Sequence, residues 1–175
     1  MSAEGSDGSP SFDGSRLFAA LDQDGRQRLM RAAKRVEQRP GALILREGDE
    51  PSAMFVLLRG ELRVTASRLD GTEVELRTLK PGAVFGEIGV LTGEPRTATV
   101  TALTDVWLME LSVDAVREIT SDYPDITGDL MRLGIERTEE TLAEVMRGDP
   151  NEESRDRGSR RGARVASSNY GSFII

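Results

Sequence analysis

From residue 36 to residue 111 the sequence is a succession of short apolar runs separated by turn residues, and no other feature restricts the fold as strongly. The turns carry glycine, often beside proline or aspartate, which are the residues that a chain needs where it reverses direction. Short apolar runs at this spacing predict an all-β barrel or jelly roll, that is, a double-stranded β-helix. The eight predicted strands cover residues 36–38, 43–45, 54–58, 62–66, 74–79, 84–85, 97–102 and 106–111.

One helix is predicted before the strands. Apolar residues recur at helical spacing from Leu17 to Ala33. Asp22 or Asp24 could cap this helix, which is expected to run to about Arg35.

Two helices are predicted after the strands. Ser112 is a candidate N-cap for a helix that reaches about Ser121. Pro124 suits the first turn of a last helix over residues 125–146. The predicted fold class is therefore mainly β with flanking helices: an eight-stranded barrel or jelly roll with one N-terminal and two C-terminal helices.

A single folded domain between two tails is expected. A chain of 175 residues suits one domain with one hydrophobic core. Residues 1–14 are rich in Ser, Gly and Asp, and residues 148–175 are polar and rich in Arg, so we expect a disordered N-terminal tail and a flexible C-terminal tail. The domain is therefore placed at residues 15–147.

The composition excludes several classes of function. The chain has no Cys and no His, so it lacks disulfides, thiolate zinc sites, Ser-His pairs and imidazole metal ligands. A net charge of −7 argues against direct nucleic-acid binding, which depends on basic surfaces. No apolar run approaches the roughly 20 residues of a membrane helix, and the first residues lack the blocks of a signal peptide. We expect a cytoplasmic protein that holds no metal and does not insert into a membrane.

Residues 85–102 combine the groups needed to hold one small phosphate-bearing ligand. Gly86 and Gly89 allow the backbone to approach a ligand closely. A short helical turn that begins near Gly86 would point unpaired N–H groups at an anion. The guanidinium of Arg96 can bind two phosphate oxygens, and the carboxylate of Glu87 can accept hydrogen bonds from sugar hydroxyls.

This segment resembles the phosphate-binding cassette of the cyclic-nucleotide-binding domain family. The family pattern is Phe-Gly-Glu, an aliphatic and a small residue, Leu-Leu, a short loop, and then Arg, a small residue and Ala-Thr-Val. The order of the predicted helices and strands is also that of the family, and the resemblance covers about residues 16–146. The residues that match in order and spacing are Phe85, Gly86, Glu87, Leu91, Arg96, Ala98, Thr99 and Val100.

The resemblance implies a role for each residue of the cassette. Arg96 would bind the cyclic phosphate, and Glu87 would accept the hydrogen of the ribose 2′-OH. Thr97 could bind the phosphate or the 2-amino group of guanine. Each also has a structural alternative, namely a surface arginine, a glutamate favoured by the helix dipole and a strand threonine. Gly86, Ile88 and Ala98 would act through their backbone amides, although turn geometry and packing could also explain them. The remaining predicted ligand contacts of the cassette are Phe85 and Gly89.

The barrel is expected to cover one face of the base with aliphatic side chains. Val74 and Val84 are predicted to do so, and Val64 and Leu76 are further candidates. All four could equally be core residues.

The last helix is expected to cover the other face. Arg137 and Thr141 interrupt its apolar stripe and lie one turn apart on the same side. Arg137 resembles a base-stacking arginine of some bacterial channel domains, and Thr141 resembles a base-contacting threonine of the catabolite-activator proteins. Both could instead be rim residues with buried stems. Gly134 inside this helix should cost about 1 kcal/mol relative to Ala, which would suit a mobile lid.

The function implied by the resemblance is a non-enzymatic regulatory module without a cofactor. It would bind cyclic AMP in preference to cyclic GMP, close its last helix over the base, and signal to a separate or missing effector such as a channel or a kinase. A homodimer through the last helix could form. Two alternatives stay open: an interaction protein that acts through its tails, with a basic run at residues 155–164 and an apolar end at 173–175, and a metal-dependent enzyme on a cupin-like barrel, which generally needs histidines.

Overall fold

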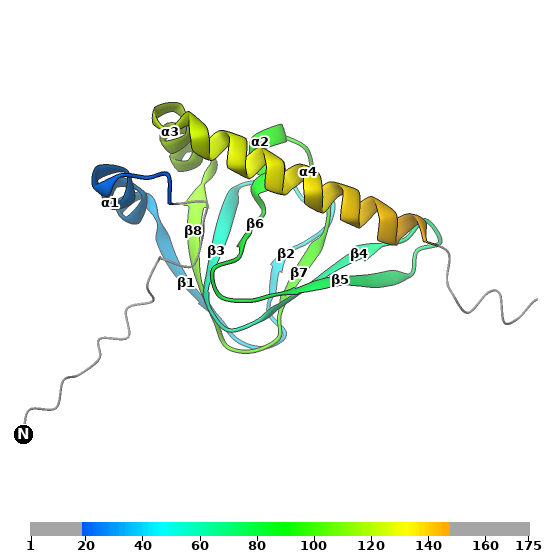
Figure 1. The fold of residues 1–175 in the computed structure, drawn as a ribbon. Coiled ribbons are helices and arrows are strands. Elements are labelled where there is room, and N and C mark those ends of the chain that lie inside the picture. Colours follow the sequence, from blue (N-terminus) through cyan, green and yellow to red (C-terminus); the bar gives the residue numbers. More distant parts are fainter. Residues whose placement is uncertain (1–18, 148–175) are drawn as a thin grey trace, which may run out of the picture.

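The computed structural model describes residues 19–147 as a β-sandwich with helices along one end (Figure 1). Among the described residues, no helix combines the length and the apolar character needed to cross a membrane. The predicted tails and residues 15–18 of the predicted domain lie outside this range. The elements in chain order are α1 (Gln23–Ala32), β1 (Lys34–Gln38), β2 (Leu43–Leu45), β3 (Ala53–Arg59), β4 (Leu62–Ser67), β5 (Glu73–Leu79), β6 (Val84–Phe85), α2 (Glu87–Thr92), β7 (Thr99–Ala102), β8 (Val106–Ser112), α3 (Val113–Asp122) and α4 (Pro124–Met146).

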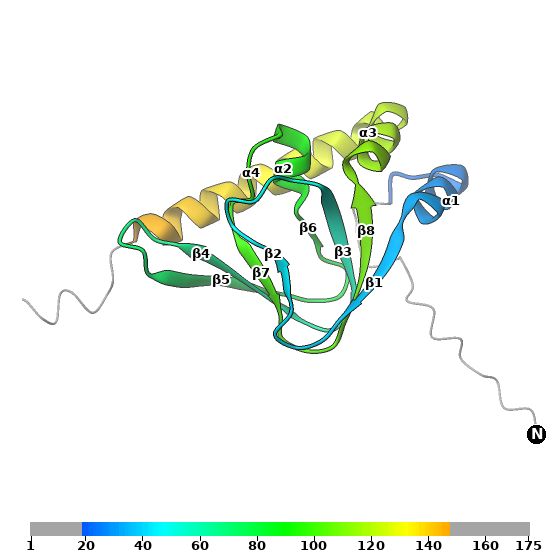
Figure 2. The same cartoon turned by 180° about the vertical axis from the view of Figure 1, so that it is seen from behind.

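The eight strands form two antiparallel sheets of four. One sheet has the order β1-β8-β3-β6 and the other the order β2-β7-β4-β5. The helices α1, α3 and α4 lie at the open end of the sandwich, and α4 runs from α3 across to the β4–β5 hairpin in both views (Figures 1 and 2). The predicted fold class is confirmed.

Alternate residues of β3 belong to two different cores. Phe55 and Leu57 face the second sheet, whereas Met54 and Val56 pack toward the helices. Because side chains alternate across a strand, a strand that is covered on both faces becomes a continuous apolar run. This explains why residues 53–57 are all buried, and why β3 lies inside the molecule while β5 lies at an edge.

The helix ends agree largely with the predicted signals. Asp22, rather than Asp24, caps α1, since its carboxylate accepts a hydrogen bond from the backbone N–H of Gly25 at 2.8 Å. The hydroxyl of Ser112 caps α3 in the same way through Ala115. The first helix was predicted to reach about Arg35, which is too long. In the structure α1 ends at Ala32, and strand β1 begins at Lys34.

Candidate functional site

The cassette begins where β6 gives way to α2. Gly86 has a φ of 76°, in the left-handed region, and forms the N-cap of α2. A Cβ atom at Gly86 would lie 3.0 Å from Nη1 of Arg96. A side chain at this position would therefore both strain the backbone and press on the arginine, so the predicted need for glycine has two separate causes.

Arg96 lies under the cassette and is held by backbone carbonyls. Its side chain donates hydrogen bonds from Nη1 to the carbonyl of Gly86 at 2.6 Å and from Nη2 to the carbonyl of Ala53 at 2.5 Å. The residue is only 6% exposed. Burial lowers the pKa of its guanidinium, and the charges of Glu87 and Asp49 partly oppose that shift.

The charge of Arg96 is not cancelled by a close carboxylate. No Asp or Glu among residues 19–147 lies within 4.0 Å of its guanidinium nitrogens. A guanidinium has five N–H groups, and the two carbonyls use two of them. The positive charge of Arg96 is therefore left without an ion-pair partner among the described residues.

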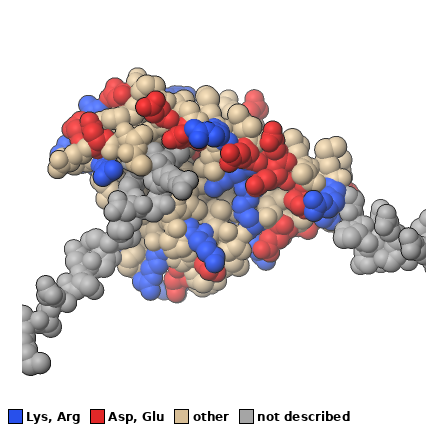
Figure 3. Space-filling model, in the orientation of Figure 1, with Lys and Arg blue, Asp and Glu red and all other residues tan. Residues whose placement is uncertain are grey.

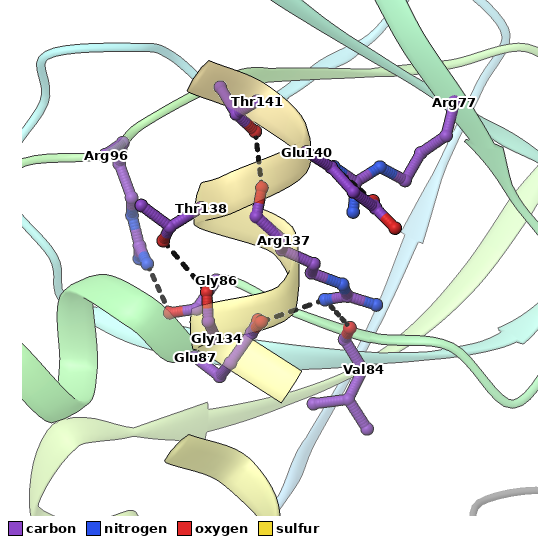
Figure 4. A network of polar contacts seen from close by, with 10 residues as sticks. All are labelled: Arg77, Val84, Gly86, Glu87, Arg96, Gly134, Arg137, Thr138, Glu140 and Thr141. Atoms are coloured by element: carbon purple, nitrogen blue, oxygen red, sulfur yellow. Dashed lines mark hydrogen bonds and ion pairs between the residues drawn. The ribbon is translucent and has the colours of Figure 1, made fainter. Parts of the chain in front are cut away.

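Glu87 and Arg137 come together across 50 residues of sequence. Glu87 is buried, with 1% of its side chain exposed, and its Oε1 lies 3.0 Å from Nη1 of Arg137. The same nitrogen donates to the backbone carbonyl of Val84 at 2.5 Å, so the α4 arginine reaches over the end of β6 (Figure 4). The sequence predicts both residues at the site but not that they pair.

A single pocket gathers most of the predicted site residues. It lies between the second sheet, the cassette and α4, and its cavity volume is about 60 Å³ within about 510 Å³ of empty space that includes open solvent. Its floor is apolar and its walls carry three guanidinium groups, from Arg77, Arg96 and Arg137. The predicted contacts that line it are Phe85, Gly86, Glu87, Ile88, Gly89, Arg96, Thr97, Ala98, Arg137 and Thr141, together with the further candidate Val64. Contact with a ligand stays a prediction for each of them.

Val74 and Val84, which were predicted to cover the base, are not among the residues that line the pocket. Val84 packs toward the helices in the core beside α4, because the alternation along β6 turns Phe85, not Val84, toward the space between the sheets. Only the carbonyl of Val84 takes part, as an acceptor for Arg137. The candidate Leu76 also lies off the pocket.

An irregularity in β5 explains why Leu76 lies off the pocket and why the sequence did not predict Arg77 and Leu79 there. Opposite β4, Thr65 pairs with Glu75 and Val64 pairs with Arg77, so the register shifts and Leu76 is an extra residue. Such a bulge reverses which residues face inward beyond it. Arg77 and Leu79 consequently line the pocket, whereas strict alternation from Val74 would have turned them outward.

Gly134 allows α4 to approach the cassette. It is buried, and a Cβ atom there would lie 3.3 Å from Cγ1 of Ile88 in α2. The sequence suggests a helix weakened by glycine, and the structure adds a packing reason for the small residue. Ile126 and Leu130, each 1% exposed, anchor the preceding turns of α4 in the core.

Comparison with known proteins supports the family to which the cassette points. The sequence matches the cyclic nucleotide-binding domain over residues 35–123, which are 89 of its 175 residues. The chain belongs to the cyclic nucleotide-binding domain family. This match includes the whole cassette and all eight strands except the first residue of β1.

Three similar proteins show how widely the domain is used. The chain is 25% identical over 133 residues to the CRP-like cAMP-activated global transcriptional regulator of Mycobacterium tuberculosis, covering 74% of this chain and 59% of the regulator. It is 33% identical over 121 residues to the cyclic nucleotide-gated potassium channel mll3241 of Mesorhizobium japonicum, covering 69% of this chain and 32% of the channel. The crystal structure of the Thermus thermophilus catabolite activator protein superposes with a TM-score of 0.65 at 26% identity, covering 74% of this chain and 61% of that one. In each case the chain spans less than two thirds of the similar protein.

Proposed function

We propose that this domain is a sensor that binds one cyclic nucleotide between its barrel and α4, with cyclic AMP favoured over cyclic GMP. The observation that carries the proposal is the buried guanidinium of Arg96, which faces the pocket with no carboxylate of residues 19–147 in ion-pair distance. A cyclic phosphodiester carries one negative charge and two free oxygens, which a planar guanidinium can bind together. The preference for cyclic AMP rests on the similar regulator, which is described as cAMP-activated.

The rest of the nucleotide follows from the phosphate position. A ribose beside the phosphate would place its 2′-OH at Glu87, where Arg137 already orients the carboxylate. The base would then extend over Val64, Leu79 and Val100 on the barrel wall toward Thr141 on α4. Stacking on this apolar floor requires no particular base. The ribose and the cyclic phosphate, rather than the base, would therefore supply most of the affinity.

Signalling would depend on α4. A ligand shifts a conformational equilibrium only when it binds one form better than the other. A nucleotide that touches both the barrel and α4 favours the form in which they are close. We propose that this closure, without any catalytic step, is what an effector protein reads.

A titration tests the proposal directly. Isothermal titration calorimetry should show binding of cyclic AMP or cyclic GMP at about micromolar affinity or tighter. Arg96→Ala should weaken that binding by more than about a hundredfold, because two charge-assisted hydrogen bonds are lost. Arg132→Ala is the matched control, since Arg132 is 68% exposed on α4 and lies off the pocket. Equal affinity in the Arg96 and Arg132 variants would refute the phosphate contact.

Self-association through α4 is the partner interaction we propose. The sequence stripe of Ile126, Leu130 and Leu133 packs on the barrel side, but α4 has a second apolar face. Its members Met131, Ile135, Leu142 and Met146 are 50–72% exposed and follow one another at spacings of 4, 7 and 4 residues. Beside it, Ile88 and Leu91 of α2 complete a groove. Such a face suits an identical helix.

Light scattering after gel filtration would test the dimer. Ile135→Glu should convert a dimer into a monomer, whereas Glu136→Lys changes the charge of the neighbouring exposed residue and should not. A monomeric wild-type protein at about 100 μM would exclude a stable dimer at the affinity expected for a standard interface.

A further inference from the structure

Beyond Arg137, few buried residues and few polar contacts attach α4 to the barrel. No residue from 138 to 146 is buried. The hydroxyls of Thr138 and Thr141 bond to carbonyls of their own helix, and Arg147 pairs with Glu144 of the same turn. The first half of the helix is different, because Ile126, Leu130 and Gly134 are buried there. The half of α4 that lies toward the β4–β5 hairpin is therefore the part whose detachment from the barrel should cost the least free energy.

Among residues 19–147, one polar side-chain contact joins this half to the barrel. Nη2 of Arg77 in β5 lies 3.2 Å from Oε2 of Glu140 in α4. Among the hydrogen bonds and ion pairs of residues 19–147, it is the single polar side-chain link between residues 138–147 and a strand. Arg77 also lines the pocket and is only 21% exposed. Figure 4 shows Arg77 and Arg96 on opposite sides of α4, so the pair lies at the end of the pocket away from the phosphate arginine.

The surroundings make Arg77 depend on this partner. Burial lowers the pKa of its guanidinium, Glu140 and more weakly Glu87 oppose that shift, and the positive charge of Arg137 adds to it. Of the carboxylates of residues 19–147, Glu140 is the one within ion-pair distance of this half-buried cation, so it is the partner that most directly holds Arg77 in place. Figure 3 shows acidic side chains gathered along α4 above basic ones on the barrel, which favours the same approach of the helix.

We propose that the Arg77–Glu140 ion pair is a clasp that holds the second half of α4 over the pocket and slows the release of a bound ligand. The proposal deepens the proposed function and rests on it for the ligand, but the attachment of the helix is a property of the ligand-free protein. Because Glu140 is 65% exposed, the pair should contribute a modest amount, equivalent to a change of about threefold, and salt should weaken it.

The first measurement needs no ligand. Amide hydrogen exchange of residues 138–146 should become about threefold faster in Arg77→Met and in Glu140→Gln, with no change at residues 126–134. The double variant should be no faster than either single variant, since both remove the same interaction. Glu139→Gln is the control, because Glu139 is on the same helix turn but lines the groove between α2 and α4 instead of the pocket. Unchanged exchange in both single variants would overturn the clasp.

The second measurement follows release of tritiated cyclic AMP and tritiated cyclic GMP after a chase with unlabelled nucleotide. Both should dissociate about threefold faster from each single variant, and 0.5 M NaCl should remove the difference between variant and wild type. The ratio of the two dissociation rates, for cyclic AMP and cyclic GMP, should stay the same in both variants. A change of this ratio in Arg77→Met but not in Glu140→Gln would overturn the clasp, because Arg77 would then act on the base. A wild-type protein that binds neither nucleotide would defeat the proposed function, and the exchange measurement would still decide the clasp.

Discussion

The two ends of the pocket are built in different ways. The end proposed to bind the phosphate, called the phosphate end below, comes from one continuous segment, in which Gly86, the α2 turn and Arg96 are set by backbone conformation and by hydrogen bonds to carbonyls. The other end comes from β5 and α4, whose Arg77, Arg137 and Thr141 are brought together only by the packing of distant parts of the chain. The first end is set by local backbone geometry, whereas the second depends on how α4 packs across the barrel.

This difference predicts how each end responds to mutation. A change at the phosphate end should reduce ligand affinity through local geometry. A change at the α4 end should first alter the stability or the position of the helix, and affinity only as a consequence. Three matched pairs of variants separate these cases.

The largest effect is expected at Arg137. Its replacement by Met leaves the carboxylate of Glu87, which is 1% exposed, without its ion-pair partner. Breaking a buried pair on one side commonly costs about 3 kcal/mol of unfolding free energy. The double variant Arg137→Met with Glu87→Gln removes the stranded charge and should recover most of that loss, while cyclic-nucleotide binding stays weak because Glu87, the proposed acceptor of the ribose 2′-OH, is also changed. Urea denaturation measures the unfolding free energy of the single and the double variant. A double variant as unstable as the single one would show that Arg137 acts through packing alone.

The phosphate end offers a comparison with identical backbone strain. Gly86 and Gly93 both have a φ of 76°, at the two ends of α2. A Cβ atom meets Arg96 at 3.0 Å in the first case and nothing within 4 Å in the second. Each change to Ala should cost about 1–2 kcal/mol of stability for the left-handed conformation. Only Gly86→Ala should also weaken nucleotide binding, by about tenfold or 1.4 kcal/mol.

Calorimetric titration of the two glycine variants provides the readout. Similar losses of affinity in both would mean that the strain of α2, rather than the position of the guanidinium, controls binding.

The same contrast explains what could be predicted from the sequence. The fold followed from the spacing of glycine turns and apolar runs, and the cassette followed from the order of residues 85–100, because both are local patterns. Arg77 was missed because the bulge at Leu76 reverses the alternation of β5, and nothing in the residue types announces it. The pairing of Glu87 with Arg137 was missed because it depends on how α4 crosses the barrel, which the helical period alone does not specify.

Val84 is the opposite case, a residue that the sequence predicts at the pocket and the structure places in the core. Its apolar character is correct for either a ligand wall or a core, and only the order of the strands decides between them. β6 lies at the edge of the first sheet beside β3, so Val84 turns toward the helices and Phe85 toward the second sheet. Residue type predicted burial there, and topology determined which core the residue enters.

The smallest effect should come from the two glycines inside α4. Gly128 is exposed, with nothing within 4 Å of a Cβ atom, whereas a Cβ atom at Gly134 would lie 3.3 Å from Ile88. Ala is favoured over Gly in a helix by about 1 kcal/mol, so Gly128→Ala should stabilise the protein by about that amount. Gly134→Ala should gain less, since Ile88 must yield by a few tenths of an ångström, and the difference between the two variants in thermal unfolding measures the contact of α4 with the cassette. Equal stabilisation by both would mean that α4 does not press on α2. The α4 end of the pocket would then be coupled to the phosphate end through the Arg137–Glu87 pair instead.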